Sequence, residues 1–330
     1  MEELQKFVTF AKKKGASDLH LVSGALPIIR VHGQLLAINK SVITLQSVQM
    51  IAQSLLNQAQ LKELDQSGDV DVGSVVGGIR LRINVHKHSG GLALAIRLIQ
   101  KDIPTSEQLG FHPSMMRIPT MMDGLVVVSG PTGSGKSTTM ASIVQEINQT
   151  SARHIITLED PIEYRFQNAQ SLIEQRQLFT HFPSFPKGLR HVLRQDPDVI
   201  VVGEMRDPET IALALTAAET GHLVLSTVHA PNASEVIERI VNVFEGAKQQ
   251  QILVQLAATL KMVVSQHLVQ QRDGGRVAAR EILTTNLAVQ NAIRQNNLSV
   301  VRSAIQTGKK DGMISMDLAL KALKKQGLID

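Results

Sequence analysis

The chain has 330 residues, of which 43% are hydrophobic and 19% charged, as in a globular protein large enough for two domains. It contains no cysteine, which excludes disulfides, thiolate zinc sites and a cysteine nucleophile. No stretch approaches the roughly 18–20 apolar residues of a membrane-spanning helix, and the N-terminus lacks the basic and apolar regions of a signal peptide. We therefore expect the chain to remain in the cytosol unless a partner tethers it.

The formal net charge of +5 raises the question of nucleic-acid binding. The basic residues are scattered along the chain, and aromatic residues make up only 3% of it. Proteins that bind single strands usually combine positive charge with aromatic stacking platforms. We therefore expect no direct contact with nucleic acid. A nucleic-acid motor remains an alternative, and ATPase activity stimulated by DNA would favour it.

Residues 1–99 have the pattern of an α+β domain with a mainly antiparallel sheet. Amphipathic helices are predicted over 2–14 and from Thr44 to Leu64. Alternating runs predict strands at 18–22, 28–36, 70–76, 79–85 and 92–98, the second bent into a hairpin at His32-Gly33. Residues 100–113 contain two prolines and a glycine with few apolar residues, which indicates an interdomain hinge.

Residues 114–330 have the alternating strand and helix pattern of an α/β domain with a parallel sheet covered on both faces. Strands are predicted at 125–129, 154–158, 199–202 and 223–228. Helices are predicted after Lys136, up to Arg194 and over 208–219. The remaining chain is helical in pattern over 232–264 and 286–327, with short strands predicted at 268–271 and 277–283.

A glycine-rich loop lies between the predicted strand 125–129 and the helix that follows it. Its sequence matches Gly-x4-Gly-Lys-Ser, and it comprises Gly130, Pro131, Thr132, Gly133, Ser134, Gly135, Lys136, Ser137 and Thr138. In such a loop, backbone N–H groups and the helix N-terminus bind phosphate. Lys136 is expected to reach the β- and γ-phosphates, and the hydroxyl of Ser137 to bind Mg²⁺. The loop predicts a site for ATP with Mg²⁺.

Acidic residues follow two of the predicted parallel strands. Glu204 comes after the strand 199–202, and the cluster 159–163 ends with Glu163 after the strand 154–158. Ligands of open α/β sheets lie at the carboxyl ends of strands, so both are expected to face the P-loop. His222 and His229 bracket the strand 223–228, and we expect them to contact the γ-phosphate and report its hydrolysis.

Several motifs resemble those of the secretion ATPase superfamily, whose members are hexameric motors of type II secretion, type IV pili and type IV secretion. These are the P-loop, residues 155–164, residues 193–207, residues 215–229 and Ala16-Ser17-Asp18-Leu19-His20-Leu21. Together the matches extend over essentially the whole chain. The resemblance implies a PAS-like N-terminal domain over 1–99, then a RecA-like P-loop ATPase domain with C-terminal helices over 114–330.

Within the superfamily, the chain is most similar to the pilus retraction ATPases. It begins at the PAS-like domain and lacks the tetracysteine insert of the assembly ATPases. The resemblance implies a homo-hexamer, cytoplasmic and peripheral at the inner membrane, that acts on a pilus platform protein and drives pilin disassembly and twitching. Gln290 and Gln295 depart from the retraction motif that residues 288–295 otherwise match. An accessory ATPase acting with a second retraction motor therefore remains open.

The resemblance also assigns roles to individual residues. Lys136 and Ser137 bind phosphate and Mg²⁺, Glu204 is the Walker B carboxylate that helps to hold the metal, and Glu163 is the general base. His222 and His229 sense the γ-phosphate. The arginines that reach the nucleotide from the N-terminal domain are Arg82 and Arg97. Two further arginines, Arg190 and Arg194, are either structural or act across a subunit interface.

Overall fold

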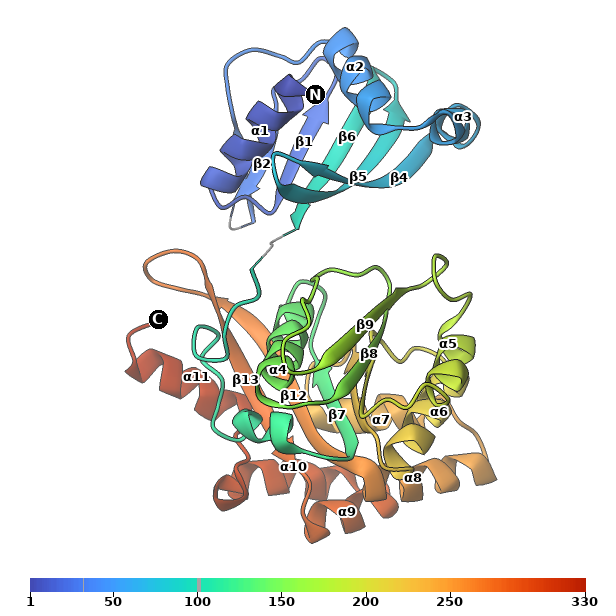
Figure 1. Cartoon of the computed structure of the whole chain (residues 1–330). Helices are drawn as coiled ribbons and strands as arrows, with labels where there is room; N and C mark the ends of the chain where they lie inside the picture. Colours follow the sequence, from blue (N-terminus) through green and yellow to red (C-terminus); the bar gives the residue numbers. More distant parts are fainter. Residues whose placement is uncertain (32, 100–101) are drawn as a thin grey trace. The chain divides into compact units, whose positions relative to one another are not determined.

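The computed structural model describes residues 1–31, 33–99 and 102–330. Internal contacts divide the chain into two units, Met1–Asp102 and Ile103–Asp330 (Figure 1). His32 of the predicted hairpin and residues 100–101 of the predicted hinge lie outside the described residues. Among the helices that are described, none is both long and apolar enough to cross a bilayer.

The N-terminal unit is built on a six-stranded sheet of order β3-β2-β1-β6-β5-β4. All neighbouring pairs are antiparallel, which confirms the predicted α+β class. The strands are β1 (Asp18–Val22), β2 (Ile28–Val31), β3 (Gln34–Ala37), β4 (Asp69–Val76), β5 (Ile79–His88) and β6 (Gly91–Ile99). The helices are α1 (Glu2–Lys13), α2 (Leu45–Leu55) and α3 (Gln58–Ser67), and α1 and α2 bury apolar residues in the core of this unit.

The single helix predicted from Thr44 to Leu64 is wrong, because a break separates α2 from α3. Leu56 is extended, and the side chain of Asn57 accepts a hydrogen bond from the Gln60 backbone N–H at 2.9 Å. The Gln60 side chain accepts in turn from the Asn57 N–H at 3.0 Å, which completes a capping box. The cap starts a new helix where the apolar periodicity had suggested a continuous one.

The second unit contains a seven-stranded sheet of order β13-β12-β7-β11-β10-β8-β9. Strands β12 to β9 in this order are parallel to one another, and β13 is antiparallel to β12. The strands are β7 (Gly124–Ser129), β8 (His154–Glu159), β9 (Leu172–Gln177), β10 (Val199–Val202), β11 (Leu223–Val228), β12 (Leu260–Gln270) and β13 (Arg276–Thr284). Parallel strands place their carboxyl ends at one edge of the sheet, which collects the residues that follow them.

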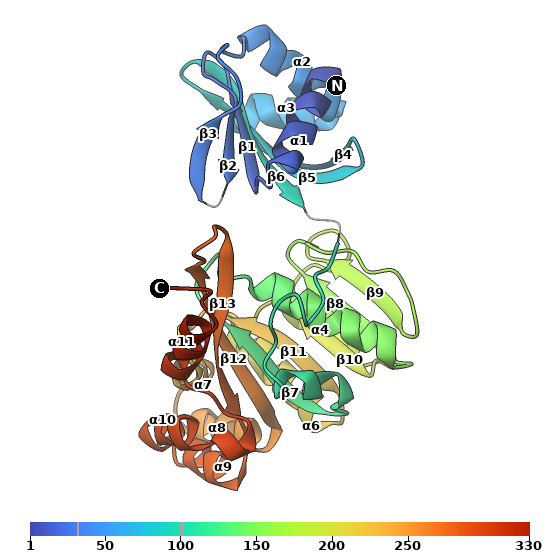
Figure 2. The same ribbon diagram turned by 90° about the vertical axis from the view of Figure 1, so that its left-hand side faces the viewer.

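Helices cover both faces of this sheet, as predicted. The α-helices are α4 (Lys136–Thr150), α5 (Phe185–Val192), α6 (Pro208–Glu219), α7 (Ala233–Val241), α8 (Ala247–Thr259), α9 (Leu287–Arg294), α10 (Leu298–Thr307) and α11 (Met316–Lys325). Short 3-10 helices are η1 (Met115–Thr120) and η2 (Lys309–Asp311). Along β7, Val126 and Val128 pack with α4 and η1, whereas Leu125 and Val127 pack with the helices of the opposite face. Helices α9, α10 and α11 lie on the β12–β13 side of the unit (Figure 2).

The helix predicted over 232–264 is wrong beyond Thr259, because β12 begins at Leu260. From Leu260 to Val264 the strand is apolar except for Lys261, and it pairs with both β7 and β13. A strand buried on both faces is apolar almost throughout and cannot be distinguished from a buried helix by periodicity alone. Strand β9 lies in the stretch for which no regular element was predicted.

Candidate active site at the P-loop

The P-loop joins the carboxyl end of β7 to the first turn of α4, as the sequence predicted. Gly130 has φ +145°, and a Cβ at this position would lie 2.3 Å from the backbone oxygen of Gln266 on β12. The glycine therefore lets the loop pass directly against the neighbouring strand. Gly133 and Gly135 also have positive φ values, +76° and +86°, which bend the loop into a cradle.

The contact of Gly130 with β12 leads to a stability prediction. Gly130→Ala and Gly133→Ala both place a Cβ on a left-handed backbone, but a Cβ at Gly133 has no neighbour within 4 Å. The difference between them reports the crowding at Gly130, where a Cβ would lie 2.3 Å from the Gln266 backbone oxygen on β12 and 2.6 Å from Oγ of Ser134. We expect Gly130→Ala to lower the free energy of unfolding by about 1–3 kcal/mol more than Gly133→Ala does. Thermal and urea unfolding of the two variants would measure this, and equal losses would contradict it.

Lys136 is the first residue of α4, and its side chain folds back over the loop. Its Nζ donates hydrogen bonds to the carbonyl oxygens of Gly130 at 2.8 Å and Pro131 at 2.9 Å. Burial lowers the pKa of the amine, and the carboxylates of Glu204 and Glu163 oppose that shift. Both carboxylates therefore act electrostatically on the lysine, although they come from different strands.

Glu204 follows β10 and forms a small charged cluster with two other residues. Its Oε2 lies 2.6 Å from Nε of Arg206 and 3.7 Å from Nε2 of His229. Burial lowers the pKa of His229, and the charge of Lys136 lowers it further, while Glu204 partly offsets both effects. The imidazole of His229 is therefore neutral at neutral pH. It lies close to the Glu204 carboxylate and is affected by the charge of Lys136.

Glu163 lies in the exposed turn that follows β8. The turn is anchored by Tyr164, whose hydroxyl is 2.9 Å from Oγ1 of Thr138 in the first turn of α4. The Glu163 backbone N–H also hydrogen bonds to the carboxyl group of Glu159, whose pKa is raised by burial. Glu159 is held by Thr157 at 2.6 Å and by Gln175 at 3.0 Å. The fold therefore fixes the backbone of Glu163 beside the P-loop and leaves its carboxylate exposed.

His222 lies away from the P-loop of its own chain. The prediction that His222 and His229 form a pair at the phosphates therefore needs correction. His222 precedes β11 and His229 follows it, so a six-residue strand separates them, about 20 Å at roughly 3.3 Å per residue. The His222 backbone carbonyl accepts from Gly124 N–H at the amino end of β7. Its Nδ1 is 2.9 Å from the carbonyl oxygen of Ala217 at the end of α6. The P-loop lies at the opposite edge of the sheet.

Arg82 and Arg97 belong to the N-terminal unit, on the neighbouring strands β5 and β6. They are directly opposite one another in the strand register, and both are exposed. Nε of Arg97 is 3.0 Å from the Asp18 carboxylate, whose strand also pairs with β6. Two like charges at one cross-strand position repel each other, and the Asp18 carboxylate offsets part of that repulsion.

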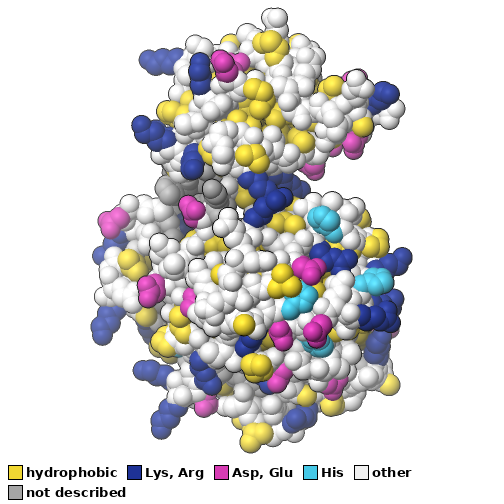
Figure 3. Space-filling model, in the orientation of Figure 1, with side chains coloured by type: hydrophobic (Ala, Val, Ile, Leu, Met, Phe, Trp, Pro, Cys, Tyr) yellow, Lys and Arg dark blue, Asp and Glu magenta, His cyan; other side chains and the backbone are white. Residues whose placement is uncertain are grey.

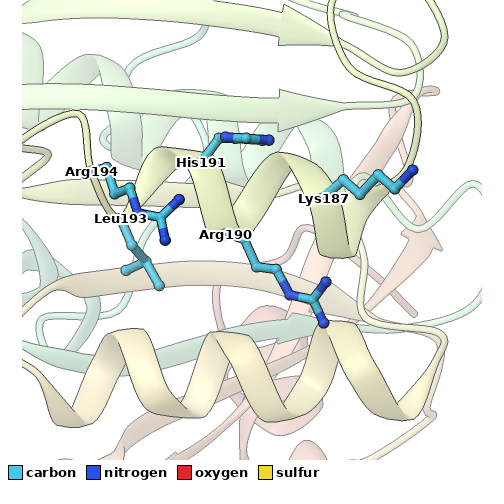
Figure 4. Close-up of a pocket in the computed structure, with 5 residues that line it drawn as sticks. All are labelled: Lys187, Arg190, His191, Leu193 and Arg194. Carbon is cyan, nitrogen blue, oxygen red and sulfur yellow. The ribbon is translucent and has the colours of Figure 1, made fainter.

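Arg190 and Arg194 lie on and just after α5, where they line a groove of about 650 Å³ with Lys187, His191 and Leu193 (Figure 4). Basic and histidine side chains gather at the edge of the unit where α5 lies (Figure 3). Arg190 pairs with Glu209 at the start of α6. This contact gives Arg190 a structural partner. A role of Arg190 and Arg194 at a subunit interface stays a prediction.

A family model for type II/IV secretion system proteins matches residues 1–321. The chain belongs to this family. It is 41% identical over 328 residues to the type IV pilus retraction ATPase PilT of Pseudomonas aeruginosa. The matched region covers 99% of this chain and 95% of PilT. A crystal structure of the pilus retraction motor PilT with bound ADP matches with a TM-score of 0.89 and 41% identity, over 99% of this chain and 94% of that one.

The type IV pilus ATPase PilU of Pseudomonas aeruginosa is also similar, with 33% identity over 329 residues, 99% of this chain and 86% of PilU. The match to this family and to the PilT crystal structure confirms the predicted fold class, a PAS-like unit followed by a RecA-like unit. The likeness to PilT extends over nearly the whole chain and is higher than the likeness to PilU.

Three residues of this secretion-family site were not singled out from the sequence: Arg206, Glu159 and Gln266. Arg206 could have been found, since it lies two residues beyond Glu204 within residues 193–207, which resemble a motif of the secretion ATPases. Glu159 was named only as part of an acidic cluster, and its burial is visible only in the fold. Gln266 donates to the carbonyl oxygen of Ser134 at 2.6 Å from β12, a strand that is far away in the sequence. The residues around Gln266 contain no pattern that would predict this contact.

The loop has the features that a nucleotide requires. The hydroxyl of Ser134 is buried and has no hydrogen-bond partner among the described residues, so it is available to a phosphate oxygen or a water. The hydroxyl of Ser137 and the carboxylate of Glu204 are hard oxygen groups of the kind that would fit Mg²⁺. Among the described residues, no three His, Cys, Asp or Glu side chains form a metal cluster. Phosphate and water oxygens would therefore complete the coordination of the ion.

Proposed function

We propose that this chain is an ATP-hydrolysing motor that powers type IV pilus retraction. The observation that carries the proposal is the meeting of Lys136, Glu204 and Glu163 at one edge of the sheet, where both carboxylates act on the P-loop lysine. The likeness to PilT over 99% of the chain supports the biological role. The ADP bound in the PilT crystal structure supports nucleotide binding by this chain.

The residues of the site divide the work of hydrolysis. P-loop N–H groups and Lys136 bind the β- and γ-phosphates, and the exposed carboxylate of Glu163 orients a water and accepts its proton. His229, neutral and 3.7 Å from Glu204, contacts the γ-phosphate and registers its departure. Mg²⁺, held by Ser137 and Glu204, would neutralise part of the phosphate charge. We do not assign contact with the γ-phosphate to His222, because it lies at the opposite edge of the sheet.

The arginines of the N-terminal unit complete the proposed mechanism. Arg82 and Arg97 are exposed and adjacent, and arginines of this kind stabilise the charge of the transferred phosphoryl group. The proposed assembly is a homo-hexamer in which Arg190 and Arg194 lie toward a subunit interface. Hydrolysis would move the N-terminal unit about residues 100–113, and a pilus platform protein at the inner membrane would receive that motion.

A second candidate is an accessory retraction ATPase that acts together with another motor. It is favoured by Gln290 in the middle of α9 and Gln295 directly after it, which replace charged residues of the retraction motif. The same helix carries Arg294, which is exposed and donates to Asn291 at 2.9 Å. If this chain restored retraction only in cells that keep a second, similar ATPase, the accessory role would replace the main proposal.

Glu204→Ala tests both the chemistry and the role. Loss of the Walker B carboxylate is expected to lower phosphate release from ATP by about 10²–10³-fold, because a ligand of the Mg²⁺ that would neutralise phosphate charge is removed. The matched control is Glu245→Ala, an exposed glutamate between α7 and α8. In a strain deleted for the gene, wild type and the control should restore twitching, and Glu204→Ala should not. Unchanged turnover would refute the chemistry, and normal retraction in the deletion strain would refute the role.

A further inference from the structure

A buried amide on β12 supports the P-loop from behind. The side chain of Gln266 is 1% exposed, and its Nε2 donates to the Ser134 carbonyl oxygen at 2.6 Å. Its Oε1 accepts from Oγ1 of Thr139 at 2.8 Å, in the first turn of α4. One side chain thus holds both the loop and the helix that follows it. Any change in the path of the loop at Ser134 must therefore displace this amide.

Arg280 is the residue of β13 directly opposite Gln266 in the antiparallel register. It is 6% exposed, and its Nε lies 3.4 Å from Oε1 of Gln266. Its Nη1 donates to the carbonyl oxygens of Leu109 at 2.8 Å and Gly110 at 3.3 Å. The guanidinium also lies over the ring of Phe111, 5.0 Å from the ring centroid. Arg280 therefore touches the amide behind the P-loop and the segment that begins the second unit.

The contacts of Arg280 are unusual for a buried charge. None of the ion pairs among the described residues includes it, and its partners there are carbonyl oxygens, an amide oxygen and an aromatic ring. Burial lowers its pKa to about 10, so the side chain is still charged at neutral pH. A buried charge is costly to leave unsatisfied, which binds residues 109–111 firmly to β13.

We propose that Gln266 and Arg280 form a relay that couples occupancy of the P-loop to the conformation of residues 103–111. The relay rests on the proposed binding of nucleotide at this loop. Lys136 donates to Gly130 and Pro131 within the loop, and phosphates would draw it away and reorganise the loop backbone. The Ser134 carbonyl, Gln266 and Arg280 transmit that change to Leu109 and Gly110. Arg280 acts as a positioning residue and does not touch the nucleotide.

Coupling of this kind is reciprocal, because a segment that responds to nucleotide must also change nucleotide affinity when it moves. Residues 103–111 lie within the predicted hinge, residues 100–113, and belong to the start of the second unit. The relay therefore gives a physical route by which the state of the loop is reported to the start of the second unit. The route runs entirely within that unit and requires no contact with the N-terminal one.

Hydrogen exchange in the full-length protein, with and without ADP and Mg²⁺, tests the relay. In wild type, ADP should change the exchange rate of residues 103–111 by at least about 5-fold. In Arg280→Met, this segment should exchange faster without nucleotide and respond to ADP by less than about 2-fold. The matched control is Arg276→Met, an exposed arginine on the same strand, and it should respond as wild type does.

A second variant keeps the test valid if Arg280→Met does not fold. Gln266→Leu interrupts the relay at the P-loop and leaves the contacts of Arg280 with Leu109 and Gly110 in place. Residues 103–111 should then stay protected but lose their response to saturating ADP. A wild-type response in either folded variant would refute the relay. So would ADP binding to wild type without any change in this segment, whereas a wild-type protein that binds no ADP would refute the proposed function as well.

Discussion

Glu163→Gln is expected to lower the rate of ATP hydrolysis by about 10²–10⁴-fold, the range that general base catalysis contributes. The substitution keeps the size of the side chain and removes its capacity to accept a proton. The turn should survive, because it is held by the Glu163 backbone N–H and by the contact of Tyr164 with Thr138 at 2.9 Å. ADP affinity should therefore change by less than about 3-fold, so the loss falls on turnover.

Phosphate release at saturating ATP and calorimetric binding of ADP would separate these two effects. Glu245→Gln provides the control, since it removes an exposed carboxylate outside the site. Turnover within about 10-fold of wild type would show that Glu163 is not the base. Glu159 would then need testing, because its carboxyl group is buried beside the same turn.

Lys136→Met is expected to weaken ADP binding by about 100-fold. The lysine supplies charge-assisted hydrogen bonds to phosphate, each contributing about 1.5–3 kcal/mol. The variant should fold, because Lys136 is 9% exposed and methionine fits a buried, unbranched position. Without nucleotide its stability should be close to that of wild type, since the substitution removes an amine that is costly to bury.

Thermal unfolding with and without ADP measures this directly. At an ADP concentration about 100 times the wild-type Kd, the ligand should stabilise wild type by about 2.7 kcal/mol and the variant by only about 0.4 kcal/mol. The control is Lys321→Met, an exposed lysine of α11, which should keep the full stabilisation. Equal stabilisation of Lys136→Met and wild type would place the phosphates elsewhere.

The acidic residues illustrate how far the sequence could be taken. Glu204 and Glu163 follow separate strands of one parallel sheet, so their meeting near Lys136 followed from the strand pattern. The same rule does not place His222 at the site, because only residues that follow a strand lie at its carboxyl end. His222 precedes β11 and His229 follows it, so the two histidines lie at opposite edges of the sheet.

Apolar runs were the least reliable guide. Leu260 to Val264 reads equally well as buried helix or buried strand, and only pairing with β7 on one side and β13 on the other decides between them. Strand β9 has an alternating pattern of partial exposure and pairs in parallel with β8 alone. Its sequence therefore lacks the apolar run that revealed the inner strands.

The P-loop could be predicted from the sequence alone, because a phosphate cradle needs glycines, a lysine and a helix start that are adjacent in the chain. The α/β alternation and the family could be predicted in the same way, since they depend on local patterns and motifs. The contact of Gln266 with Ser134, and the contacts of Arg280 with Gln266 and Leu109, are visible only in the folded protein. These residues are far apart in sequence, and the order of strands in the sheet brings them together.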